Sequence, residues 1–122
     1  EAELEDKALS KNVTVASRSQ AKILTITTET ADSLTDIQKT AEQRLSNIRS
    51  CHNSILKSNP KVTGLLVVTT EIKEGIVSNV TIKSNETNNT ELENCVRRRI
   101  KRWKFPTSCS ASATISFGLN IQ

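Results

Sequence analysis

The residues that could carry out covalent chemistry are few: this chain of 122 residues has three cysteines and one histidine. His52 directly follows Cys51, and adjacent residues of a helix point to different sides, so a catalytic Cys–His pair would need Cys95 or Cys109. Cysteines this far apart, with a single histidine, do not match the spacing of zinc ligands. We therefore expect no metal and no cofactor, and we interpret His52 as a half-buried or surface residue of a helix.

Other catalytic patterns are missing from the sequence. The three glycines, Gly64, Gly75 and Gly118, are isolated, so none belongs to a phosphate-binding loop. The carboxylates are scattered, and no pair is distinctive enough to serve as a general acid and a general base. We therefore predict that the protein is not an enzyme and has no small-molecule substrate.

The most concentrated charge lies in "CVRRRIKRWKFP", where six of the eight residues from Arg97 to Lys104 are Lys or Arg. The net charge of the whole chain is only +4, so the remainder is close to neutral. We favour a solvated helix face, because Trp103 falls on the apolar stripe and leaves no exposed aromatic for base stacking. The alternative is a site for nucleic acid or another anionic polymer, formed by Arg97, Arg98, Lys101, Arg102 and Lys104.

Hydrophobic periodicity predicts the elements that must position these residues. Residues Ile23–Thr28 are rich in Thr and Ile, which predicts a strand, and a weaker alternation before Ser17 predicts a shorter one. Apolar residues then recur every three or four positions, which predicts one helix over Asp36–Ser58. Thr35 and Gln38 have the spacing of a capping box at its start.

The middle of the chain predicts a β-hairpin. Two β-branched runs flank Lys73-Glu74-Gly75, where Gly75 can take the positive φ that a short loop needs. The first strand, Leu65–Ile72, is apolar on both faces, which predicts a central place in the sheet. The second strand is expected to point three apolar residues to one side, namely Ile76, Val80 and Ile82.

A second helix and a last strand complete the pattern. Asn89 or Thr90 can cap the helix, whose apolar stripe is Leu92, Cys95, Val96, Ile100 and Trp103. The last strand, Ala113–Ile121, alternates apolar and polar residues without interruption. It contains neither a charge nor a proline, which are the usual devices that protect an edge strand from pairing.

These elements predict a single α+β domain at residues 23–122, preceded by a partly ordered N-terminal extension at residues 1–22. We expect an antiparallel sheet of three to four strands with two helices on one face. The strand Leu65–Ile72 is expected in the middle, and Ala113–Ile121 at an edge. The three cysteines leave two alternatives, one disulfide with one free thiol or three free buried thiols, and we favour the disulfide.

The order helix, hairpin, basic helix and strand resembles a known family. "IRSCHNSILKSNPKVTGLLVVTTEIKEGIVSNVTIKSN", then "LENCVRRRIKRWKFP", then the closing strand are similar to the C-terminal domain of the AgmX/PglI family of bacterial gliding-motility and envelope proteins, which is related to the TonB C-terminal domain. The resemblance covers Leu34 to Gln122. The chain departs from the family pattern at His52, where an aromatic residue is usual, and at Ser116-Phe117-Gly118, where the family has a proline.

The resemblance implies a non-enzymatic periplasmic docking domain, tethered by a membrane anchor upstream of this chain and bound to a periplasmic or outer-membrane protein of the envelope. With the helix stripes, it also implies a Cys51–Cys95 disulfide. We expect the partner to add a strand along the last strand, in contact with Ala113, Thr114, Ile115, Ser116, Phe117, Gly118 and Leu119. The alternative is that this edge is covered by the strand Ile23–Thr28 of the same chain or by a second copy of the domain.

Overall fold

The structure is a computed structural model, and it describes residues 18–29 and 31–122. The shorter strand expected before Ser17 and most of the N-terminal extension lie outside the described residues. The elements are β1 (Lys22–Thr28), a 3₁₀ turn (Ala31–Ser33), α1 (Leu34–Gln43), α2 (Leu45–Leu56), β2 (Gly64–Lys73), β3 (Ile76–Asn85), α3 (Thr90–Lys101) and β4 (Ala111–Leu119).

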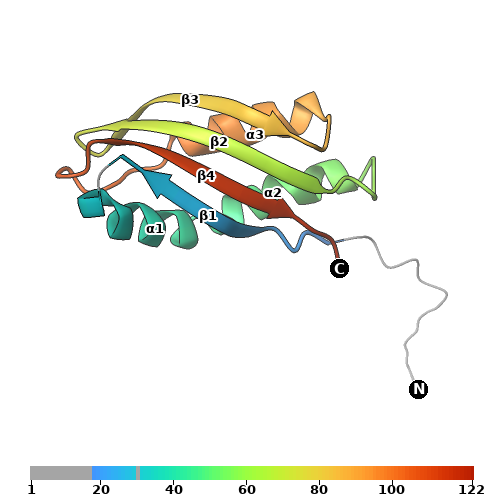
Figure 1. Cartoon of the computed structure of the whole chain (residues 1–122). Helices are drawn as coiled ribbons and strands as arrows, with labels where there is room; N and C mark the ends of the chain where they lie inside the picture. The colour runs from blue at the N-terminus through green and yellow to red at the C-terminus, as the bar shows by residue number, and fades with distance from the viewer. Residues whose placement is uncertain (1–17, 30) are drawn as a thin grey trace, which may run out of the picture.

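The four strands form one antiparallel sheet in the order β1-β4-β2-β3, with the three helices packed against one face (Figure 1). This confirms the α+β class and the interior position of β2. The predicted edge position of β4 is wrong, because β1 pairs along one side of β4 and β2 along the other. The alternative in which the chain's own first strand covers β4 describes the observed sheet.

The single helix predicted over Asp36–Ser58 is divided into α1 and α2 by a turn at Arg44, whose backbone φ is −104° and ψ is 8°. α1 packs on β1, whereas α2 packs on α3. The turn therefore lets two segments of one apolar stripe cover different parts of the fold. The predicted capping box is also wrong, because α1 starts at Leu34 after the 3₁₀ turn, which places Thr35 inside the helix.

The β2–β3 hairpin forms where it was predicted. Gly75 has a φ of +83°, and a Cβ there would lie 2.5 Å from the carbonyl oxygen of Phe105, so both the conformation and the space require glycine. Irregularities in the pairing of β3 with β2 fall beside Ser78 and Lys83. The first of them reverses the side-chain alternation, so Val77 is buried and Ile76 is 65% exposed, contrary to the prediction.

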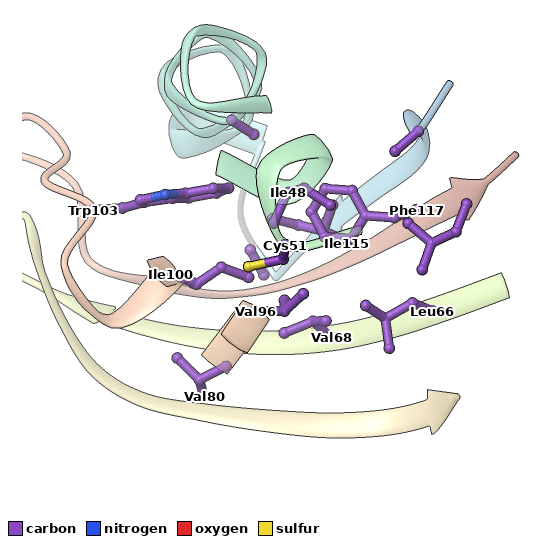
Figure 2. Close-up of a cluster of buried hydrophobic side chains, with 14 of the residues drawn as sticks. Ile48, Cys51, Leu66, Val68, Val80, Val96, Ile100, Trp103, Ile115 and Phe117 are labelled. Carbon is purple, nitrogen blue, oxygen red and sulfur yellow. The ribbon is translucent and has the colours of Figure 1, made fainter. Parts of the chain in front are cut away.

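The core lies between the sheet and the helices, with Val96 and Ile100 of α3 facing side chains of β2 and β4 (Figure 2). A row of side chains crosses the sheet on this face, formed by Ile26, Ile115, Val68 and Ile82. The adjacent row on the other face consists of Thr27, Thr114, Thr69 and Thr81. The sheet thus has one apolar face under the helices and one hydroxyl-rich face.

The helix α3, which the sequence analysis predicted as the second helix, follows the sequence pattern closely. Asn89 is the N-cap of α3, and its Oδ1 accepts a hydrogen bond of 2.8 Å from the backbone N–H of Leu92. Leu92, Val96 and Ile100 are fully buried, and Trp103 is only 3% exposed, which confirms the predicted stripe. Among the described helices, none has the length and apolar character needed to cross a membrane.

Candidate functional site

A disulfide joins the two helices that face each other across the core. Cys51 of α2 and Cys95 of α3 are bonded, with their Cα atoms 5.7 Å apart. Cys51 is buried and Cys95 is half-buried, so one sulfur lies close to the surface between the helices. The predicted pairing is confirmed, and Cys109 is a free, buried thiol.

His52 is fully buried, contrary to the half-buried or exposed position expected for it. Its Nε2 lies 2.6 Å from the carbonyl oxygen of Val62, which can only accept, so the ring proton is on Nε2. Nδ1 lies 2.7 Å from the Ser19 hydroxyl oxygen, which also accepts from the N–H of Ala21. Both ring nitrogens therefore have partners within the fold. Through them, His52 of α2 is joined to Ser19, which precedes β1, and to Val62, which precedes β2.

The basic residues in α3 and just after it do not form one site. Arg98, Lys101, Arg102 and Lys104 are exposed, whereas Arg97 is half-buried and donates to Oδ1 of Asn94 at 3.1 Å. Lys104 leaves the helix and forms an isolated bridge with Ile76 beside the hairpin. Of the five residues predicted for an anionic partner, Arg102 lines one cavity and Arg98 lines another.

Two arginines that were not predicted as site residues, Arg44 and Arg99, line one of these cavities together with Arg102. Arg44, Asn47, Arg99, Arg102 and Trp103 line a cavity of about 350 Å³ between α2 and the end of α3, named here the arginine pocket. Arg99 belonged to the visible basic run. Arg44 carried no sequence signal, because it lies 55 positions earlier in the chain and its place depends on the turn between α1 and α2.

A second cavity of about 340 Å³ adjoins the arginine pocket and shares Arg99 with it. It follows the disulfide along the helix pair and is lined by Cys51, Ser54, Ile55, Glu91, Cys95, Arg98 and Arg99. Three arginines line the first cavity, whereas the second adds a carboxylate and an apolar side chain to its two arginines. In the described part of the chain, no group of three or more His, Cys, Asp and Glu residues could hold a metal ion.

The residues predicted to bind a partner by strand addition lie inside the sheet. Ala113, Ile115, Phe117 and Leu119 are buried in the core, and Thr114, Ser116 and Gly118 lie on the opposite face. Because hydrogen-bonded neighbours flank β4 on both sides, it has no free backbone edge for a partner. The prediction that a partner adds a strand along β4 is therefore wrong.

Among the described strands, β1 and β3 each pair with one neighbour, so they lie at the two ends of the sheet. β1 adjoins a depression of about 160 Å³, which it shares with α1 and which is lined by Ile23, Leu24, Thr25, Ile26, Leu34, Gln38 and Glu42. Leu24 is 47% exposed there. The edge of β3 carries the two pairing irregularities, and Ser78, at one of them, lines a cavity of about 470 Å³ shared with β2 and β4.

Comparison with models of protein families, with curated proteins and with solved structures found no match for this chain.

Proposed function

We propose that this chain is a non-enzymatic protein–protein docking domain of a bacterial cell-envelope protein, which binds an extended partner segment by strand addition along the outer edge of β1. The observation that carries the proposal is the position of β1 at the end of the described sheet, beside the depression it shares with α1. Backbone groups of an edge strand bind an added strand, and adjacent depressions select its side chains.

The periplasm and the envelope context rest on the resemblance of the segment Leu34 to Gln122 to the AgmX/PglI and TonB C-terminal domains. The Cys51–Cys95 disulfide supports an oxidising compartment, because disulfides persist in the periplasm and are rare in the cytosol. The proposed partner is an envelope protein of the periplasm or outer membrane.

β1 is favoured over β3 for a physical reason. Extra residues in β3, at Ser78 and Lys83, break the regular spacing of its backbone groups, and such bulges protect an edge from pairing. β1 has one irregularity, near Leu24, and pairs regularly from Thr25 to Thr28. Its depression also includes the apolar residues Ile23, Ile26 and Leu34.

Two matched variants test the proposal. Lysine on an edge strand opposes pairing, and Leu24 and Ile76 are the two large hydrophobic residues exposed in the described part of the chain. Proteins captured from a periplasmic extract by the wild-type domain should still bind Ile76→Lys and should be lost with Leu24→Lys. The reverse result would assign docking to β3, and equal capture by both variants would exclude strand addition at β1.

A further inference from the structure

We infer that the arginine pocket binds carboxylates of an acidic peptide segment presented by a partner protein. The inference is separate from strand addition, because none of the residues of the arginine pocket lines the depression beside β1. It begins from three arginines, Arg44, Arg99 and Arg102, which line one cavity of about 350 Å³.

These three cations have no compensating anion within the described residues. No guanidinium of the three forms a hydrogen bond or an ion pair with residues 18–29 or 31–122. Like charges that line one cavity repel each other. A bound anion would relieve this repulsion, so the arginine cluster favours an anionic ligand.

The walls of the arginine pocket are held in place before any ligand arrives. Trp103 Nε1–H donates to Asn47 Oδ1 at 3.0 Å, which ties the end of α3 to α2. The disulfide adds a second tie nearby, because Cys51 follows Asn47 by one helical turn and Cys95 precedes Arg99 by one turn. The Asn47 amide has donated nothing in this contact, so its N–H₂ group also remains available to an anion.

The residues that line the arginine pocket and the adjoining cavity favour an acidic peptide over other anions. Guanidinium groups match carboxylates and phosphates equally well, through paired N–H donors. However, the adjoining cavity places Glu91 beside Arg98 and Arg99, so its charges are mixed, and Ile55 offers an apolar contact there. A peptide with both acidic and apolar side chains matches this mixture better than a uniform polyanion. The three aromatic residues of the chain, Trp103, Phe105 and Phe117, are all buried, so no base-stacking surface exists for single-stranded nucleic acid.

The experiment uses the single tryptophan of the chain, which lines the arginine pocket, as a local reporter. The probes are a dye-labelled peptide of alternating Glu and Gly, the same peptide with Gln for Glu, and single-stranded oligo-dT, each at about 150 mM salt. We expect the Glu peptide to bind, to change the emission of Trp103, and to bind more tightly than either other probe.

Matched variants separate the arginine pocket from general electrostatics. The triple variant Arg44→Gln, Arg99→Gln and Arg102→Gln should weaken binding of the Glu peptide by about tenfold or more. The control Arg97→Gln, Lys101→Gln and Lys104→Gln removes the same charge outside the arginine pocket and should change the affinity by less than about threefold. Arg44→Gln alone, at an exposed position, covers the case in which the triple variant does not fold.

The inference is overturned if both triple variants lose affinity equally, if the Gln peptide binds as well as the Glu peptide, or if Trp103 emission does not respond. Tighter binding of oligo-dT than of the Glu peptide would instead assign the site to nucleic acid. Loss of strand addition in Leu24→Lys with intact binding of the Glu peptide would show that the two surfaces act independently.

Discussion

Trp103 and Asn47, 56 positions apart in the chain, are joined by a hydrogen bond of 3.0 Å from the indole N–H to the side-chain carbonyl oxygen. The indole is 3% exposed, so it fills the space between α2 and the end of α3 and also satisfies its polar group. The chain then turns toward the hairpin, where the N–H of Phe105 donates to the carbonyl of Gly75. Trp103 thus holds the end of α3 on α2 just before the chain reaches the β2–β3 hairpin.

Replacing Trp103 by Ala should lower the free energy of unfolding by about 3–5 kcal/mol, because it opens a large cavity in the core. Trp103→Phe keeps most of the ring and loses the bond to Asn47, so we expect a smaller loss of about 1–2 kcal/mol. Urea denaturation followed by circular dichroism measures both values. A Trp103→Ala variant with an unchanged midpoint would contradict the burial of this side chain.

Removing the disulfide should destabilise the domain through the unfolded state. Cys51 and Cys95 close a loop with a sequence separation of 44. The chain-entropy model assigns about 4 kcal/mol to a loop of this length. The double variant Cys51→Ala and Cys95→Ala should lose a comparable amount, whereas added reductant should leave that variant unchanged. Mass spectrometry of a non-reduced digest checks the pairing, and a peptide that links Cys109 to either partner would refute it.

Thr70 lies on the core face of β2, is fully buried, and has an Oγ1 with no hydrogen-bond partner among the described residues. A buried hydroxyl without a partner costs free energy, so Thr70→Val should raise the free energy of unfolding by about 1 kcal/mol. Thr69→Val is the matched control on the opposite face, where Oγ1 of Thr69 lies 3.2 Å from that of Thr114. Thermal denaturation should show a gain for Thr70→Val only, and a loss at Thr70 would contradict its unpaired state.

The buried thiol of Cys109 predicts a dependence of stability on pH. Burial raises the pKa of Cys109 above the ordinary value of 9.0, the hydrogen bond with Ser33 opposes this rise, and the charge of Asp36 adds to it. The folded state therefore holds this proton more tightly than the unfolded state, so the stability it contributes is present below pH 9.0 and is lost as the pH rises above that value. Unfolding free energies should fall more steeply above this pH in the wild type than in Cys109→Ala. Parallel curves for the two proteins would show that Cys109 does not contribute.

Local patterns were sufficient for most of the elements. The cap at Asn89, the stripe of Leu92, Val96 and Ile100, and the positive φ of Gly75 are all properties of short segments, where neighbouring residues decide the backbone. The same reasoning missed the turn at Arg44. Apolar residues keep the same helical spacing before and after Arg44, so periodicity alone gives no signal for the change in direction between α1 and α2.

The candidate sites depended on contacts between distant segments. The last strand has the composition of an open edge, yet Ile26 pairs with Ile115 across most of the length of the chain and covers it. His52 is buried because Ser19 and Val62 supply partners for its ring, and the arginine pocket exists because Arg44 meets Arg99 and Arg102. The pattern of apolar and polar residues along a strand or a helix indicates which face is buried. It does not indicate which neighbouring element packs against that face. That choice is made by the packing of the whole domain, and both the position of β1 at the end of the described sheet and the arginine pocket result from it.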